Sequence, residues 1–221
     1  MEIKNNIIKH YLRNALFING TAYAGKSTMC KLLAEKYDLV HCEENYNSDV
    51  IFNVINEEDQ PNLSYFNTKK SWEEYLNRTP EVYHKWVKGN DKELFGFEIA
   101  EIIRLSQNKK VIVDTNIPIN ILNEIADYHQ IAIMLSNESM AVNKFFDRED
   151  EDKKFLLEQI NKCPNPREVK ENFIAGQVLH HKSDYDMYLN CGCYTIIRDN
   201  LDECFIDKAM PKLAKHFKLI E

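Results

Sequence analysis

The sequence predicts an α/β domain in which helices cover both faces of a parallel, doubly wound sheet. Five short apolar segments alternate along the chain with longer segments of helical periodicity, and this alternation is typical of parallel sheets. A turn with two glycines joins the first apolar segment to the first long helical one. The chain has 221 residues, of which 44% are hydrophobic, so we expect a single domain over 1–221 with helical insertions.

The first elements follow from the spacing of apolar residues. Residues 3–12 carry them at helical intervals and predict a short amphipathic helix, whereas the apolar run at 15–19 predicts the first strand. The pattern of 26–37 predicts the first long helix, and 38–42 a second strand that ends before two glutamates. A ligand site in such a sheet is expected at the carboxyl ends of the strands.

The segment 46–90 is polar and aromatic, and we expect it to be a helical insertion after the second strand. Its largest aromatic residues recur at helix-like intervals: Trp72, Tyr75, Tyr83 and Trp86. They can stack on an aromatic ligand, but aromatic residues at this spacing more often form a core. A separate helix is expected at 91–107.

The second half of the chain repeats the alternation. A buried strand is predicted at 111–114, a helix at 118–128 and the fourth strand at 131–135. The last strand is expected at 194–197 and a closing helix at 201–217. These elements complete a five-stranded sheet.

The turn between the first strand and the first long helix contains a complete G-x-x-x-x-G-K-[ST] motif: Gly20-Thr21-Ala22-Tyr23-Ala24-Gly25-Lys26-Ser27-Thr28. The glycines allow a tight turn whose N–H groups point at phosphate oxygens. Lys26 supplies charge at the β- and γ-phosphates, and the Ser27 hydroxyl can ligate magnesium. The helix N-terminus adds partial positive charge at the same point. The motif therefore predicts a site for a nucleoside triphosphate.

Asp114 is the second chemical signal. Three apolar β-branched residues precede it at the end of the predicted strand 111–114, which is the Walker B pattern. A carboxylate at this position lies near the magnesium ion of the phosphate-binding loop, so Ser27 and Asp114 are the candidate metal residues. The alternative is that Asp114 caps the helix that follows.

Glu43 and Glu44 follow the second strand at the same edge of the sheet. A hydroxyl that accepts a phosphoryl group needs a carboxylate to orient it and to take its proton. Because adjacent residues point to opposite sides, at most one of the pair faces the site, and Glu44 is slightly preferred. Asp49 is a further candidate, and a solvated acidic turn is the alternative.

The segment 138–182 is highly charged and helical in character, and we expect it to be a lid. Pro164 and Pro166 interrupt it. Arg148 within it is a candidate to clamp the transferring phosphoryl group, and Arg167 is a weaker one. The alternative is that Arg148 pairs with its acidic neighbours on a solvated surface.

Charge and composition limit the partners. With a formal net charge of −7, the chain offers no broad attraction to nucleic acid, so a small-molecule acceptor is expected. No apolar run reaches the roughly 18 residues of a membrane span, and the N-terminus has no apolar signal core. A nucleotide site indicates the cytoplasm, where free cysteines are expected. Cys191 and Cys193, with His180 and His181 nearby, are interpreted as core residues rather than as a metal site.

On these residues the chain resembles the P-loop kinase group, which includes nucleoside and nucleotide monophosphate kinases, shikimate and gluconate kinases, and antibiotic phosphotransferases. The resemblance is carried by Gly20 to Thr28, Glu43-Glu44, Val111-Ile112-Val113-Asp114 and Arg148. It implies ATP with Mg²⁺ as the phosphoryl donor, a strand order of 2-3-1-4-5 and a lid over the phosphates. It also implies an adenine contact near Arg198-Asp199-Asn200.

The chain lacks the sequence with which adenylate kinase-like members of this group bind a phosphorylated acceptor. Adenylate kinase-like enzymes usually carry Gly-Phe-Pro-Arg after the Walker B aspartate, whereas here the run is Thr115-Asn116-Ile117-Pro118-Ile119. Arg78 and Arg104 flank the aromatic insertion and are candidates to bind an anionic acceptor. Acidic residues dominate the neighbourhood, so a neutral or cationic acceptor is expected instead.

These observations predict a small-molecule kinase that moves the γ-phosphoryl group of ATP to a hydroxyl. The alternatives are an ATPase or GTPase switch and a regulatory module that binds nucleotide without acceptor chemistry. The long insertion at 46–90 favours a kinase, because a switch needs no acceptor-binding helices. We expect an acceptor pocket between the second strand and this insertion, lined by Glu43 or Glu44 and walled by aromatic residues between Trp72 and Trp86.

Overall fold

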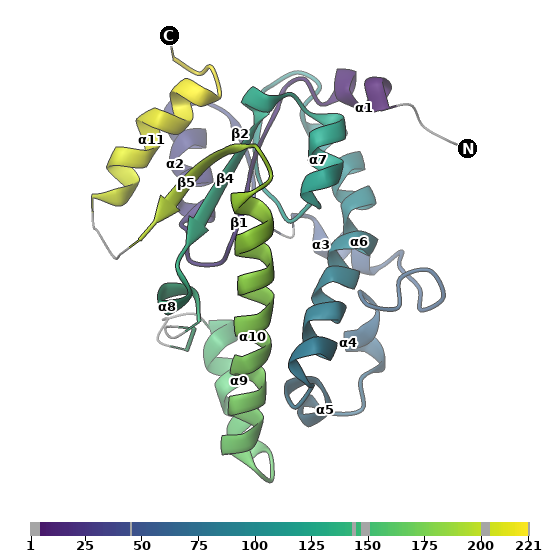
Figure 1. The fold of residues 1–221 in the computed structure, drawn as a ribbon. Helices are drawn as coiled ribbons and strands as arrows, with labels where there is room; N and C mark the ends of the chain where they lie inside the picture. Colours follow the sequence, from purple (N-terminus) through teal and green to yellow (C-terminus); the bar gives the residue numbers. More distant parts are fainter. Residues whose placement is uncertain (1–4, 45, 143–144, 147–150, 200–203, 221) are drawn as a thin grey trace.

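The computed structural model describes residues 5–44, 46–142, 145–146, 151–199 and 204–220. Its centre is a five-stranded sheet: β1 (Ala15–Gly20), β2 (Val40–Cys42), β3 (Val111–Asp114), β4 (Ile131–Ser136) and β5 (Tyr194–Arg198). All neighbouring strands are parallel, and their order is β2-β3-β1-β4-β5 (Figure 1). The predicted α/β class, the parallel sheet and the strand order are confirmed.

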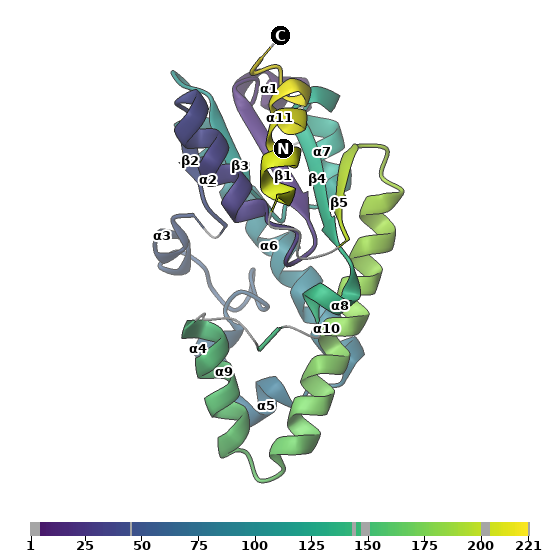
Figure 2. The same cartoon turned by 90° about the vertical axis from the view of Figure 1, so that its left-hand side faces the viewer.

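The helices of the described residues are α1 (Asn5–Tyr11), α2 (Lys26–Tyr37), α3 (Ser48–Phe52), α4 (Tyr65–Thr68), α5 (Trp72–Leu76), α6 (Pro80–Leu105), α7 (Ile119–Ile125), α8 (Glu138–Ala141), α9 (Glu151–Lys162), α10 (Pro166–Leu189) and α11 (Phe205–His216), with a 3₁₀ turn at Tyr128–Gln130. The helices α2 and α11 cover one face of the sheet (Figure 2). The other face packs against α7 and the sheet-proximal ends of α6 and α10.

The central strands are mainly apolar because both faces of the sheet are covered. Every residue of β1, β3 and β4 is buried. Alternate side chains enter opposite cores: Leu16 and Ile18 pack beneath α2 and α11, and Phe17 packs on the other side. Ile18 pairs with Asp114, and Gly20 pairs with Met134. This register brings the carboxyl ends of β1, β3 and β4 to one edge of the sheet.

A helical layer extends from that edge (Figure 1). The long helices α6 and α10 pack along each other, and α5 and α9 lie at their far end. A cluster of buried aromatic and aliphatic residues holds this layer together: Tyr75, Leu76, Tyr83, Phe145, Ile160, Val169 and Phe173. Trp72 and Trp86 pack against it, so these aromatic residues contribute to a core, as their spacing predicts.

The expected boundary between the insertion and the helix that follows it is wrong. The helix predicted at 91–107 begins at Pro80 and runs unbroken to Leu105, so the insertion after β2 ends at Thr79. Thr79 is the N-cap, and its side chain accepts a hydrogen bond from the Val82 amide at 3.4 Å. Pro80 occupies the first helical turn, where its missing N–H costs nothing.

Pro166 has the same role at the start of α10. It does not break a helix but begins one, and α10 continues to Leu189, beyond the expected end of the lid at 182. The second strand is also shorter than expected. Asp38 adopts a left-handed conformation with φ of 52° as the C-cap of α2, so β2 begins only at Val40.

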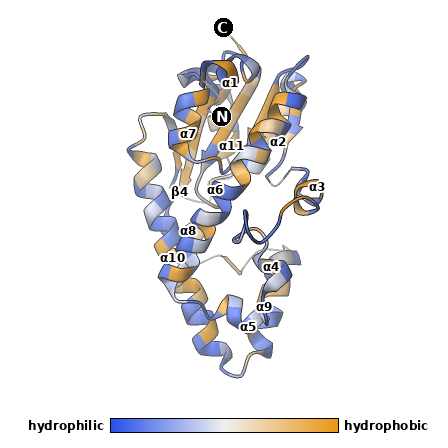
Figure 3. Cartoon of the chain, turned by 90° about the vertical axis from the view of Figure 1, so that its right-hand side faces the viewer, coloured by the Kyte–Doolittle hydropathy of each residue, from blue (hydrophilic) through white to orange (hydrophobic). Residues whose placement is uncertain are grey.

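Hydropathy follows this architecture. The strands are orange in Figure 3, and the helices of the lower layer alternate between polar and apolar residues. Among the described residues, no helix is long and apolar enough to cross a membrane.

Candidate functional site

The turn between β1 and α2 has a backbone that only glycine allows at two points. Gly20 has φ of 133° and Gly25 has φ of 90°. A Cβ atom at Gly20 would lie 1.9 Å from the carbonyl oxygen of Met134, so any side chain would collide with β4. Gly25 leaves the N-terminus of α2 without a side-chain cap. The first N–H groups of α2 therefore remain available to an anion.

Hydrogen bonds from neighbouring elements hold this turn in place. The Ser136 amide donates to Thr21 Oγ1 at 2.8 Å, and the Ser136 hydroxyl donates to the carbonyl of Ala22 at 2.6 Å. Asn19 Oδ1 accepts from the Tyr188 hydroxyl at 2.8 Å. Asn19, Ser136 and Tyr188 were not predicted as site residues, because they belong to no motif and meet only in the folded chain.

Lys26, Ser27 and Asp114 meet beside the turn. The Ser27 hydroxyl donates to Asp114 Oδ2 at 2.6 Å, and Lys26 Nζ lies 3.9 Å from Asp114 Oδ1. Asp114 is 1% exposed, and burial raises its pKa although Lys26 and Ser27 lower it. Its Oδ1 is buried without a hydrogen-bond partner. The helix-capping alternative for Asp114 is wrong, because α7 begins after Pro118 without a side-chain cap.

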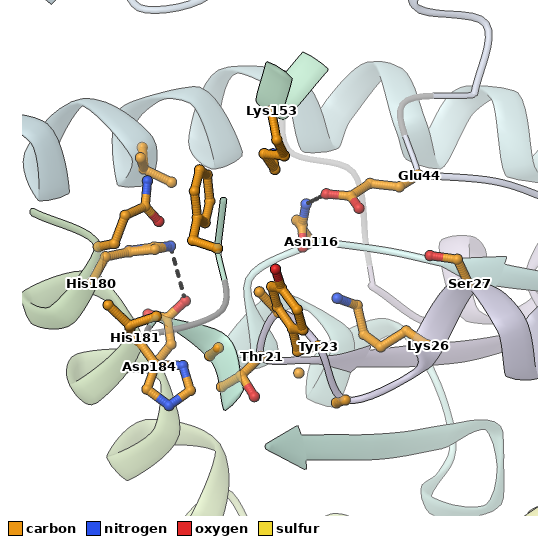
Figure 4. Close-up of a pocket in the computed structure, with 18 of the residues that line it drawn as sticks. Thr21, Tyr23, Lys26, Ser27, Glu44, Asn116, Lys153, His180, His181 and Asp184 are labelled. Carbon is orange, nitrogen blue, oxygen red and sulfur yellow. Dashed lines mark hydrogen bonds and ion pairs between the residues drawn. The ribbon is translucent and has the colours of Figure 1, made fainter. Parts of the chain in front are cut away.

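A cavity of about 540 Å³ opens over this turn (Figure 4). The complete motif from Gly20 to Thr28 lines one side of it. The remainder is lined by α5, α6, α8, α9 and α10 and by the segments after β2, β3 and α8, and its polar members are Glu44, Asp91, Asn116, Lys153, Gln177, His180, His181 and Asp184. The cavity therefore places cationic Lys26 opposite a polar wall built by distant parts of the chain.

A smaller cavity of about 300 Å³ lies between the end of β2, α3 and α6. This is the place where the sequence predicts an acceptor pocket. Five residues line both cavities: Glu44, Tyr83, Val87, Asp91 and Asn116. The two cavities therefore adjoin. Of the predicted aromatic wall, Tyr83 and Trp86 line the smaller cavity, whereas Tyr75 lines the larger one.

The structure distinguishes the two glutamates after β2. Glu44 lines both cavities, and its Oε1 accepts a hydrogen bond from Asn116 Nδ2 at 2.7 Å (Figure 4). Glu43 lines only the smaller cavity, and its side chain is 75% exposed beside His41. Asp49 lines neither cavity. Asn116 was not predicted, although it stands only two positions after Asp114.

A partly buried charged cluster forms the wall opposite Lys26. Lys88 Nζ lies 2.6 Å from Asp184 Oδ1 and 3.9 Å from Asp91 Oδ2. His180 Nε2 lies 3.5 Å from Asp184 Oδ2, and His180 Nδ1 lies 3.2 Å from His84 Nδ1. Burial lowers the pKa of His180 to about 4 and raises the pKa of Asp91 to about 7. His180 is therefore neutral at pH 7.

The predicted arginines do not join this site. Arg148 lies outside the described residues. Arg167 is exposed and pairs with a glutamate one helical turn away. Arg78 stacks on the Tyr65 ring with 3.9 Å between its Cζ and the ring centroid, and Arg104 pairs with a neighbouring glutamate on the surface. Neither cavity is lined by an arginine of the described residues.

The segment expected to contact adenine lies beside the turn. Arg198, at the end of β5, donates from Nη1 to the carbonyl of Tyr23 at 3.3 Å, and its guanidinium lies over the Phe205 ring. The Asp199 carbonyl accepts a hydrogen bond from Asn137 at 2.6 Å. Asn200 lies outside the described residues. Arg198 thus supports the backbone of the turn.

Comparison with known proteins identifies no relative: no family, curated protein sequence or solved structure matches the chain. Within the described ranges, no group of three or more His, Cys, Asp and Glu side chains is placed to hold a metal ion. Function is therefore inferred from the turn, the Ser27–Asp114 pair and the two adjoining cavities.

Glu98, which lines the smaller cavity, is expected to make the stability of the fold depend on pH. Its Oε1 accepts a hydrogen bond from Thr115 at 2.5 Å, and burial raises its pKa from 4.5 to about 7. The folded state therefore holds a proton that the unfolded chain releases, so this group lowers stability as pH rises from about 5 to 7. We expect Glu98→Gln to gain stability relative to the natural protein over that range, by up to about 3 kcal/mol.

Urea unfolding at about pH 5, 6 and 7 measures this difference. Glu57→Gln is the matched control, because Glu57 is exposed and lines neither cavity. The control should follow the natural protein at every pH. A constant stability difference between Glu98→Gln and the natural protein would contradict the raised pKa of Glu98.

Proposed function

We propose that this chain is a P-loop phosphotransferase that moves the γ-phosphoryl group of ATP to a hydroxyl of a small molecule. The observation that carries the proposal is the junction of the two cavities at Glu44 and Asn116. The complete phosphate-binding motif lines one cavity, and the helices after β2 line much of the other. Donor and acceptor can therefore meet at a carboxylate that is held by a hydrogen bond.

The donor side supplies positive charge in three forms. The N–H groups of the turn and the uncapped start of α2 face the larger cavity, and Lys26 adds a full charge beside them. Lys26 is 9% exposed, so solvent screens this charge little. These groups match the negative charge of a triphosphate and stabilise the transferring phosphoryl group.

The chain also offers a place for the Mg²⁺ ion that such chemistry uses. Asp114 Oδ1 is buried without a hydrogen-bond partner, and the Ser27 hydroxyl lies beside the same carboxylate. Mg²⁺ is commonly held by one or two such oxygens together with phosphate and water. Asp114 and Ser27 fit this role, and the ion would supply charge neutralisation at the β- and γ-phosphates.

On the acceptor side Glu44 is the candidate general base. The hydrogen bond from Asn116 orients one oxygen of its carboxylate and leaves the other to accept a hydroxyl proton. In the proposed reaction, the acceptor oxygen forms a bond to the γ-phosphorus while the bond to the β–γ bridging oxygen breaks. ADP leaves with that oxygen, and Glu44 takes the acceptor's proton.

The decisive test follows transfer of label from γ-labelled ATP. The protein is incubated with Mg²⁺, labelled ATP and pooled metabolites, and a non-hydrolysable ATP analogue is used in parallel thermal-shift measurements. We expect nucleotide to stabilise the fold, some metabolites to stabilise it further, and those same metabolites to acquire label. Label released only as inorganic phosphate would indicate an ATPase, and nucleotide binding without turnover would indicate a regulatory module. An absence of nucleotide binding would overturn the proposal.

A further inference from the structure

The smaller cavity combines carboxylates with aromatic rings. Its acidic residues are Glu43, Glu44, Asp91, Glu98 and Asp114, and its aromatic residues are Tyr46, Phe52, Phe66, Tyr83 and Trp86. None of the described residues that line it is a lysine, arginine or histidine. Ordinary polar pockets mix both signs of charge, so this cavity has an unusually one-sided electrostatic character.

Cations near the cavity neutralise only part of this charge. Lys88 lies 3.9 Å from Asp91, but it lies closer to Asp184, at 2.6 Å, and is shared between the two carboxylates. The partner of Glu98 is the hydroxyl of Thr115, which carries no charge. Taking carboxylates out of water without a counterion is costly, so a bound cation would stabilise this wall.

The pKa values of Asp91 and Glu98 are consistent with several carboxylates lying close together. Burial raises the pKa of both Asp91 and Glu98 to about 7. The Thr115 hydroxyl lowers the pKa of Glu98, whereas the charges of Asp91, Glu44 and Asp114 raise it further. Lys88 lowers the pKa of Asp91, and Asp184 and Glu44 raise it. A positive ligand between the two carboxylates would favour their ionised forms.

The aromatic part of the wall is held rigidly. Trp86 Nε1 donates to the carbonyl of Asn62 at 3.1 Å, which fixes the indole at the cavity. Its ring packs with those of Phe66 and Tyr83. Arg78 already lies over the Trp86 ring and Lys69 over the Phe66 ring, each 5.2 Å from the ring centroid, so rings of this wall do attract cations. In the same wall, Asn90 Oδ1 is buried without a hydrogen-bond partner, which leaves an acceptor for an N–H group.

We propose that the smaller cavity binds the acceptor of the proposed phosphotransferase, and that this acceptor is an organic ammonium compound with a hydroxyl group and an apolar or ring portion. Asp91 and Glu98 contact its ammonium group, and its hydroxyl group faces Glu44. A phosphorylated acceptor would place like charges together. A neutral one would leave Glu98 without a cationic partner and Asp91 with only its share of Lys88.

A matched pair of probes tests the charge preference. Phenylethanolamine and phenylethanediol share a ring and a hydroxyl but differ in the ammonium group, and phenyl phosphate supplies the opposite charge. Binding is measured by calorimetry with Mg²⁺ and a non-hydrolysable ATP analogue present. We expect phenylethanolamine to bind about tenfold more tightly than phenylethanediol, and phenyl phosphate to bind most weakly. Equal affinities, or no binding of the amine at about 10 mM, would overturn the proposal.

Variants then locate the contact. Asp91→Asn and Glu98→Gln should each reduce the preference for the amine about tenfold, with thermal unfolding measured to confirm that each variant folds. Glu57→Gln, outside both cavities, should leave the preference unchanged. An undiminished preference in both cavity variants would overturn the assigned contact.

Because binding is measured without turnover, the experiments can contradict the ammonium acceptor and the phosphotransferase independently of each other. Amine binding without phosphoryl transfer in the labelled-ATP assay would leave the cavity assignment standing and overturn the kinase. Transfer to neutral acceptors, without any preference for amines, would leave the kinase standing and overturn the ammonium acceptor.

Discussion

Replacing Lys26 with alanine is expected to lower nucleotide turnover by about 10²-fold or more and to leave the fold intact. The Lys26 ammonium is the one full positive charge that the phosphate-binding motif contributes to the larger cavity. Its loss removes stabilisation of charge that develops on the transferring phosphoryl group. The apolar core does not depend on this side chain, because Lys26 belongs to neither of the clusters that flank the sheet.

The matched control is Lys31→Ala, which removes a charge of the same sign from an exposed position of α2. Calorimetry measures the affinity for ATP and Mg²⁺, and a coupled assay measures turnover in the presence of an acceptor found in the labelled-ATP screen. Thermal unfolding shows whether each variant is folded. If Lys26→Ala retains both the affinity and the turnover of the natural protein, the nucleotide assignment of the turn is wrong.

The parts of the fold that could be predicted are those whose signal lies in adjacent residues of the sequence. The bounds of α2 follow from the motif that precedes it, and buried strands such as β3 and β4 appear as continuous apolar runs because both faces of the sheet are covered. Strand order has no such local signal, and it was expected only from the resemblance to P-loop kinases. The division of α6 was wrong because Tyr83 and Trp86 in its first half were assigned to the insertion, although Thr79 and Pro80 mark the start of the helix.

The candidate site likewise contains residues that a local sequence pattern identifies and residues that only the folded chain brings together. Ser27 and Asp114 were predicted together because the motif and the strand end each have a recognisable sequence. Asp91 and Asp184 meet through Lys88 only because α6 and α10 pack along each other, and nothing in either segment identifies its partner. The choice between Glu43 and Glu44 likewise needed the position of Asn116, which follows a different strand.

That choice gives the sharpest test of the acceptor chemistry. Glu44→Gln is expected to lower phosphoryl transfer by about 10²-fold or more while the affinity for ATP and Mg²⁺ stays unchanged. The amide keeps the size of the side chain and can still accept the hydrogen bond from Asn116, but it is too weak a base to take a hydroxyl proton. Glu43→Gln is the matched control, since its exposed side chain lines only the smaller cavity.

Single-turnover measurements with labelled ATP separate the chemical step from binding and product release in both variants. A general base should also give transfer a dependence on pH that Glu44→Gln lacks and Glu43→Gln retains. Equal losses in the two variants would indicate a shared effect of negative charge at the end of β2. Full activity in Glu44→Gln would show that Glu44 is not the general base, because this variant and the natural protein differ only in that side chain at the junction where donor and acceptor must meet.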